Sequence, residues 1–102
     1  MSEQTVIVHF AYGQTDLGPL YELEDQLIAA IEAADAGEFD GNEIATDGSD
    51  GSLYMYGPDA DRLFEAVRPV LASAACLQNA VATIRYGPSE DGVEERKVPI
   101  DS

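Results

Sequence analysis

The fold is decided by residues 52–61, whose sequence is SLYMYGPDAD. Its first half, Ser52 to Tyr56, is rich in aromatic and large apolar residues, which predicts a compact strand. Gly57 and Pro58 end that strand, and the carboxylates of the following residues suit the positive end of a helix whose first position lies near Pro58. We therefore predict a strand that turns directly into a helix.

The segments on either side of this stretch extend the pattern. Apolar residues at helical spacing predict a helix over residues 58–75, in which Pro69 is expected to kink the helix or end its first section. Residues 80–86 are rich in β-branched residues and predict the next strand. Upstream, residues 38–46 predict a weaker strand with a turn or bulge at Asp40-Gly41-Asn42. We expect it to form a hairpin with 52–56 across the turn cluster 47–51.

The first third of the chain shows the same strand-to-helix order. Residues 5–12 are β-branched and aromatic and predict a strand. Pro19 suits the first turn of a helix over 19–36, with Asp16 or Gly18 as its N-cap. The apolar positions of this helix recur at three- and four-residue steps: Leu20, Leu23, Leu27, Ile31 and Ala34.

The order strand, helix, strand, strand, helix, strand predicts a single α+β domain over residues 1–102. Right-handed crossovers close this order into the ferredoxin-like, split βαβ arrangement, a four-stranded antiparallel sheet with both helices on one face. The tail from Val93 to Ile100 is expected to add a short fifth strand at an edge, since Pro99 does not suit a central strand. An α+β sandwich with five strands is the alternative if the tail pairs fully.

The charge is unusual, with 20 acidic residues against five basic ones and a formal net charge of −15. Such a chain repels phosphate backbones and anionic lipids, so nucleic acid and membrane are not expected as partners. No apolar run approaches the roughly 20 residues that cross a bilayer, and no basic signal-peptide region precedes the first strand, which together favour a cytoplasmic location. The acidity is explained by solubility in a salty cytoplasm, by a salt-adapted source, or by attraction of a basic partner.

Four segments carry a resemblance: Gly37–Ile44, Leu53–Asp61, Arg68–Leu71 and Arg85–Pro88. They resemble a group of short, uncharacterised bacterial α+β proteins of similar layout. The resemblance implies a self-contained bacterial domain, and no known activity or site residue comes with it.

No cofactor or metal site is expected. The oxygen-rich residues between Asp40 and Asp50 lack the ligand spacing and flanking helices of a calcium loop. One histidine and one cysteine make no zinc site without carboxylates. His9 and Cys76 would need to meet, with a third orienting group, for nucleophilic catalysis, and Cys76 is more simply an apolar filler at a helix end. We therefore predict no catalytic residues.

Strand alternation nevertheless predicts a distinctive surface on the face of the sheet that the helices leave open. The residues expected there are Ile7, His9, Tyr54, Tyr56 and Arg85. This set is more aromatic and apolar than a solvated face needs; the plainer alternative is that the tyrosines only shield the sheet. RNA stacking on it would need more basic residues than the chain has.

We therefore predict a non-enzymatic interaction or self-assembly module that forms a homodimer through this face. One alternative is a small-molecule sensor or enzyme that uses the same face, marked by a pocket beside His9 and Arg85. Another is an acidic inhibitor of a basic partner protein.

Overall fold

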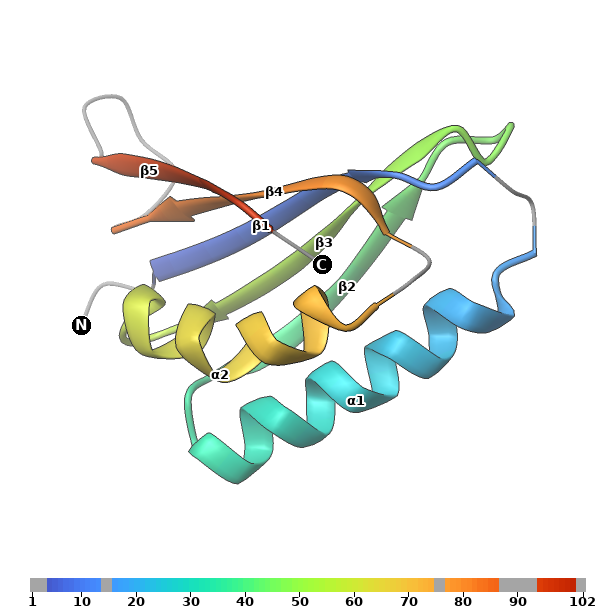
Figure 1. Ribbon diagram of the computed structural model, residues 1–102. Coiled ribbons are helices and arrows are strands. Elements are labelled where there is room, and N and C mark those ends of the chain that lie inside the picture. Colours follow the sequence, from blue (N-terminus) through green and yellow to red (C-terminus); the bar gives the residue numbers. More distant parts are fainter. Residues whose placement is uncertain (1–3, 14–15, 75–76, 87–93, 101–102) are drawn as a thin grey trace.

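The computed structural model describes residues 4–13, 16–74, 77–86 and 94–100. The elements follow one another in the order β1 (Gln4–Ala11), α1 (Gly18–Ala34), β2 (Glu38–Ile44), β3 (Asp50–Gly57), α2 (Ala60–Ala72), β4 (Gln78–Arg85) and β5 (Glu95–Pro99). The strands form one antiparallel sheet in the order β2-β3-β1-β4-β5. Both helices lie on the same side of the sheet (Figure 1). The protein therefore has the predicted ferredoxin-like α+β arrangement, with the tail as a fifth, edge strand that contains Pro99.

The hydrophobic core lies between the sheet and the two helices. Alternate residues of β1 and β3 are fully buried, among them Val8 and Leu53, and α1 contributes Leu20, Leu23, Leu27 and Ile31, as predicted. No buried residue in the described part of the chain is polar or charged. The polar side chains described below therefore all belong to the surface.

The starts of both helices differ from the prediction. The N-cap position of α1 is Leu17, and Asp16 instead accepts a hydrogen bond from the Gly18 N–H through its Oδ1 at 3.0 Å. In α2 the N-cap is Asp59, whose Oδ1 accepts from the Arg62 N–H at 3.2 Å. Pro58 thus lies before the cap rather than in the first turn. An extended Asp59 brings its carboxylate within reach of the free N–H groups of that turn, which a proline cannot do.

Pro69 does not end α2, which continues to Ala72. The missing N–H of Pro69 removes one intrahelical bond, and the last turn still closes through the Ser73 N–H to the Pro69 carbonyl at 3.2 Å. The helix is nevertheless shorter than the predicted 58–75. Cys76, the predicted filler at this end, lies outside the described residues, as does the turn after β4.

The hairpin of β2 and β3 confirms the predicted bulge. The register shifts between Phe39 and Gly41, so that Asp40 is the extra residue on β2. Strand β3 begins at Asp50, inside the predicted turn cluster, because Asp50 and Gly51 pair with β1. Within the described residues, neither helix is long and apolar enough to cross a membrane.

Negative charge is spread over the chain, and α1 alone has four acidic residues and no basic one: Glu22, Glu24, Asp25 and Glu32. We expect added salt to stabilise the protein by screening this repulsion, most strongly at low ionic strength. A gain of about 1 kcal/mol would raise Tm by roughly 4–8 °C at this size. Thermal melts across a sodium chloride series measure the effect, and a midpoint that stays flat or falls would contradict it.

Candidate functional site

The open face of the sheet, on the side away from the helices, is built from three rows of residues. Each row takes one residue from every strand. The residues of a row share one face of the sheet, because paired residues of antiparallel strands point to the same face. The rows are Glu38–Tyr56–Thr5–Arg85–Glu95, Gly41–Tyr54–Ile7–Thr83–Lys97 and Glu43–Ser52–His9–Val81–Pro99. All five residues of the predicted surface therefore lie on this one face, distributed over the three rows.

The two tyrosines turn their hydroxyl groups toward β2. The Tyr54 hydroxyl donates to Glu43 Oε2 at 3.0 Å, and the Tyr56 hydroxyl donates to Glu38 Oε2 at 2.7 Å. The bond to Glu43 favours the protonated phenol and raises the pKa of Tyr54. The rings are half-buried, so each tyrosine presents an apolar body on the face while its polar end is occupied.

His9 lies in the third row with two polar neighbours. Its Nδ1 is 3.1 Å from Ser52 Oγ, and its Nε2 is 3.6 Å from Asp50 Oδ2. The order Asp, His, Ser is that of a nucleophilic triad. However, 3.6 Å is too long for the orienting hydrogen bond, and the His9 and Asp50 side chains are 62% and 52% exposed. Activation of a serine needs a firmly oriented base and positioned donors for the oxyanion, so this cluster is better suited to binding than to catalysis.

A hollow of about 430 Å³ opens beside this cluster. It is lined by His9, Glu43, Ile44, Ala45, Thr46, Asp50, Gly51 and Ser52. Asp50 and Ser52 were missed by the sequence analysis, although Ser52 shares the alternation of Tyr54 and Tyr56 and could have been assigned to the face. Arg85 does not border this hollow.

Arg85 instead pairs with the fifth strand. Its Nε is 3.3 Å from Glu95 Oε2, and its Nη2 donates to Glu95 Oε1 at 3.5 Å. This pair lies in the first row, two rows away from His9. The predicted set is thus divided between a tyrosine pair beside β2, a histidine cluster and a separate arginine–glutamate pair.

The charge of the open face differs from that of the whole chain. The three rows contain three glutamates and two basic residues, Arg85 and Lys97, and Asp50 lies beside His9 on the same face, which gives a formal charge of −2 with His9 neutral. The whole chain carries −15. The centre of the face is apolar or uncharged, with Tyr54, Ile7 and Thr83 side by side. The face is therefore weakly charged, with an uncharged centre, on a strongly acidic protein.

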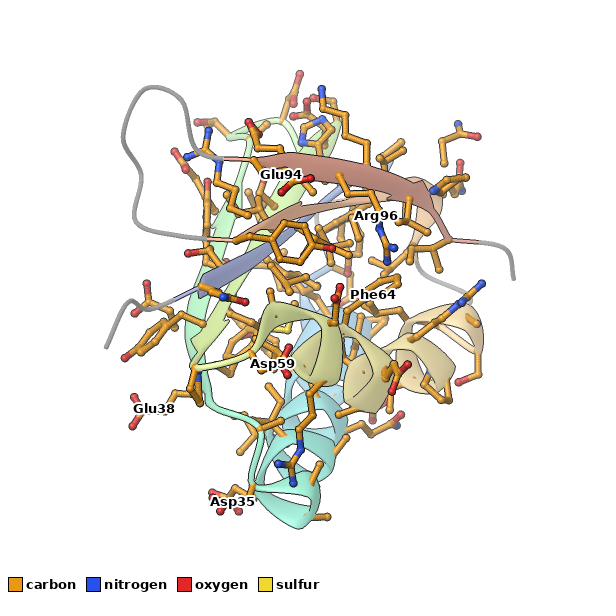
Figure 2. The ribbon with its side chains drawn as sticks, turned by 90° about the vertical axis from the view of Figure 1, so that its left-hand side faces the viewer. Asp35, Glu38, Asp59, Phe64, Glu94 and Arg96 are labelled. Carbon is orange, nitrogen blue, oxygen red and sulfur yellow. The ribbon has the colours of Figure 1, made fainter. Side chains whose placement is uncertain are left out.

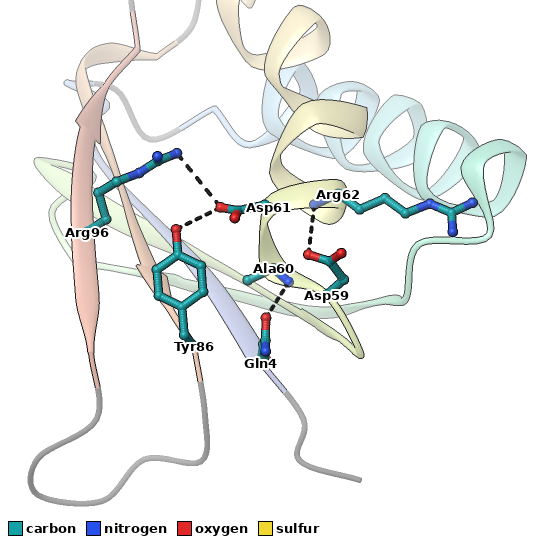
Figure 3. A network of polar contacts seen from close by, with 7 residues as sticks. All are labelled: Gln4, Asp59, Ala60, Asp61, Arg62, Tyr86 and Arg96. Carbon is teal, nitrogen blue, oxygen red and sulfur yellow. Dashed lines mark hydrogen bonds and ion pairs between the residues drawn. The ribbon is translucent and has the colours of Figure 1, made fainter.

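A second polar cluster joins the start of α2 to the sheet (Figure 3). Asp61 Oδ1 accepts a hydrogen bond from the Tyr86 hydroxyl at 2.7 Å and lies 3.8 Å from Arg96 Nη2. Gln4 Oε1 accepts the Ala60 N–H at 2.7 Å. These contacts connect α2 with β1, β5 and the end of β4, which indicates a structural role.

The hydrogen bonds of Tyr54 and Tyr86 predict that the folded protein loses stability in alkali. Hydrogen bonds to Asp61 and Glu43 raise the pKa values of Tyr86 and Tyr54 above the ordinary 10.0. A raised folded-state pKa gives stability that is present below the unfolded pKa and is lost as pH rises through the folded pKa. Unfolding measured between about pH 9 and pH 12 should therefore show falling stability above about pH 10. A smaller fall is expected in the Tyr54→Phe/Tyr86→Phe variant, and equal slopes would contradict the assignment.

Within the described residues, no group of three or more histidine, cysteine or acidic side chains is placed to hold a metal ion. The open face consists of a tyrosine pair, an apolar centre, a histidine beside a hollow and an internal ion pair.

Comparison with known proteins supports the fold. No family model matches the sequence, and no curated protein matches it. The structure of Rv0793 from Mycobacterium tuberculosis is similar, with a TM-score of 0.59 at 21% identity over 89% of this chain and 99% of that one. Part of TiaS, in its crystal structure with a tRNA, AMPCPP and agmatine, is also similar, with a TM-score of 0.51 at 16% identity. That match covers 82% of this chain and 23% of TiaS. At these identities the likeness concerns the fold alone.

Proposed function

We propose that this protein is a non-enzymatic interaction module that pairs with a second copy of itself through the open face of its sheet. The observation that carries the proposal is the low charge of this face, whose centre is uncharged, on a chain of −15. Two acidic copies repel each other over most of their surfaces, and the repulsion is smallest where charge is scarce. The open face is such a surface.

The apolar centre of the face supplies the attraction. Ile7, Tyr54 and Tyr56 are half-buried within the sheet and would lose their remaining exposure against a partner. Because both tyrosine hydroxyls already have acceptors, burial would leave neither without a hydrogen bond. The fifteen residues of the three rows are fewer than the roughly 20–30 that each side of a standard interface uses, so the affinity is expected to be modest.

The proposal places this pairing in a bacterial cytoplasm. The resemblance to short bacterial proteins supports the source, and the single cysteine of the sequence suits a reducing compartment.

The second candidate function is the binding of a small polar molecule in the hollow beside His9. Ser52 and Asp50 offer hydrogen-bonding groups there. The hollow does not include Arg85, although a pocket beside both His9 and Arg85 was predicted for this alternative. The low charge and apolar centre of the open face favour self-association over this alternative.

Sedimentation velocity of the unaltered protein tests the proposal. The screening length falls from about 10 Å at 0.1 M salt to about 3 Å at 1 M, so dimerisation is expected to strengthen as sodium chloride is raised between these values. A protein that stays monomeric at high salt and high protein concentration would contradict self-association.

A further inference from the structure

A second surface lies away from the centre of the open face, between α1 and β2. A hollow of about 270 Å³ opens there, lined by Ile28, Ile31, Glu32, Gly37, Glu38 and Phe39. The most exposed large hydrophobic side chains of the described residues are Tyr21 at 54% and Ile28 at 38%, and both belong to α1. This surface is therefore apolar at its centre, and among its lining residues it shares only Glu38 with the rows of the open face.

Carboxylates surround that apolar centre. Tyr21, Asp25, Ile28 and Glu32 follow one another at steps of three or four residues and so share one side of α1. Glu38 lines the hollow from the β2 side, and Figure 2 shows it projecting outward on the same side as Asp35 at the end of α1.

Polar contacts fix the position of α1 beside this surface. Asn42 donates to Glu24 Oε2 at 2.7 Å and so connects β2 to α1. Arg62 of α2 contacts the end of the same helix, where its Nη2 donates to the Ala34 carbonyl at 2.7 Å. The Asn42–Glu24 bond therefore joins the two sides of the hollow, and the Arg62 contact attaches the end of α1 to α2.

Strand β2 forms one edge of the sheet, so its outer side has no strand beside it within the described residues. The backbone groups on the outer side of an edge strand can pair with an added strand. The bulge at Asp40 interrupts this edge, and the hollow lies on the side of the bulge where Gly37, Glu38 and Phe39 are found. An extended chain that paired here could place a side chain in the hollow.

We infer that the groove between α1 and β2 binds an extended, basic segment of another protein. The backbone of that segment pairs with the edge of β2, an apolar side chain enters the hollow against Ile28 and Phe39, and flanking lysine or arginine side chains meet Glu32 and Glu38. Charge complementarity selects this occupant, because the described residues that line the hollow include two carboxylates, Glu32 and Glu38, and no basic residue. A second copy of this acidic chain would be repelled from the same groove. The inference does not depend on self-association through the open face.

A pair of synthetic peptides tests it. The probes are two fluorescein-labelled octapeptides of equal charge, one alternating lysine with leucine and the other alternating lysine with serine. Fluorescence anisotropy is expected to show at least about tenfold tighter binding of the lysine–leucine peptide, which is the effect of one buried aliphatic side chain. Equal binding of the two peptides, or no binding of either, would overturn the inference.

Substitutions in the groove test whether the peptide binds there. Ile28→Ser, at a partly exposed position that folding should tolerate, is expected to weaken binding of the lysine–leucine peptide about tenfold. Glu32→Gln is expected to weaken it about threefold. The matched control Glu65→Gln removes the same charge from an exposed position on α2 and should have little effect. Equal effects of the two glutamine variants would show general charge attraction and overturn the inference.

Hydrogen exchange tests the strand pairing. Bound peptide is expected to slow amide exchange in Glu38–Ile44, and exchange there that stays unchanged would overturn the pairing with β2. Tyr54→Glu, on the open face, should leave peptide binding intact. A loss of binding in that variant would place the peptide on the open face and overturn its assignment to the groove.

Discussion

Tyr54→Glu is expected to turn the self-associated protein into a folded monomer. Tyr54 lies in the central row of the open face beside Ile7, so a partner would cover it. A carboxylate there would be buried without a counter-charge and would face Glu43, the present acceptor of the Tyr54 hydroxyl. A cost of about 3 kcal/mol for such a burial weakens association more than 100-fold. Sedimentation velocity at high salt, where the unaltered protein is most associated, measures the change.

Tyr21→Glu is the matched control for this variant. It makes the same chemical change and adds the same charge, but at a residue of α1 that is 54% exposed and lies on the helix side of the molecule. We expect it to leave the association constant within about threefold, a free-energy change below about 0.7 kcal/mol. If Tyr21→Glu dissociates the protein as strongly as Tyr54→Glu, the effect comes from net charge, and the open face is not the interface. A thermal melt of each variant confirms that the monomer is folded.

The features that the sequence predicted are those governed by local periodicity. A period of two residues in 5–12 and 52–56, and of three to four in the first helix, determines which side chains face the core. With right-handed crossovers, these faces leave few ways to assemble the sheet. For the same reason, Ile7 and Tyr54 could be assigned to the open face before any contact was known.

The features that the sequence could not predict depend on register. Tyr54 and Tyr56 bond to Glu43 and Glu38 only because β2 pairs with β3 in one alignment, shifted by the bulge at Asp40. Arg85 meets Glu95 because the tail pairs with β4. The pattern of the sequence indicates each strand but does not say which residue of its neighbour lies opposite.

The groove between α1 and β2 was missed for a related reason. Ile28 appears in the sequence as one more apolar residue of a helix, and Phe39 as part of a weak strand. Their meeting depends on the angle at which α1 crosses the sheet, and that angle is set by core packing. A tertiary contact of this kind leaves no periodic signal in either segment.

The connection between α1 and β2 contains the closest backbone approach among the described glycines. Gly37 and Gly57 pass each other where β2 begins and β3 ends, one residue beyond the paired Glu38 and Tyr56. A Cβ on Gly57 would lie 2.2 Å from the Ala36 carbonyl oxygen and 3.0 Å from the Gly37 Cα. A Cβ on Gly37 would lie 2.1 Å from the Tyr56 carbonyl oxygen. The atoms that these Cβ groups would meet belong to the backbone where β2 begins and β3 ends, so they cannot move away by rotation as a side chain would.

Gly57→Ala is therefore expected to be strongly destabilising, by about 3 kcal/mol or more, because relief of the overlap requires movement of the strand end. For a protein of this size, that corresponds to a fall in Tm of roughly 12 °C or more. Gly18→Ala is the matched control, since its added Cβ would meet only the exposed Asp16 side chain, at 3.2 Å, in the first turn of α1. There alanine favours the helix, and the change should stay within about 1 kcal/mol of the unaltered protein. Thermal melts of the two variants under one set of conditions compare them directly, and similar Tm values would show that the junction can open to admit a methyl group.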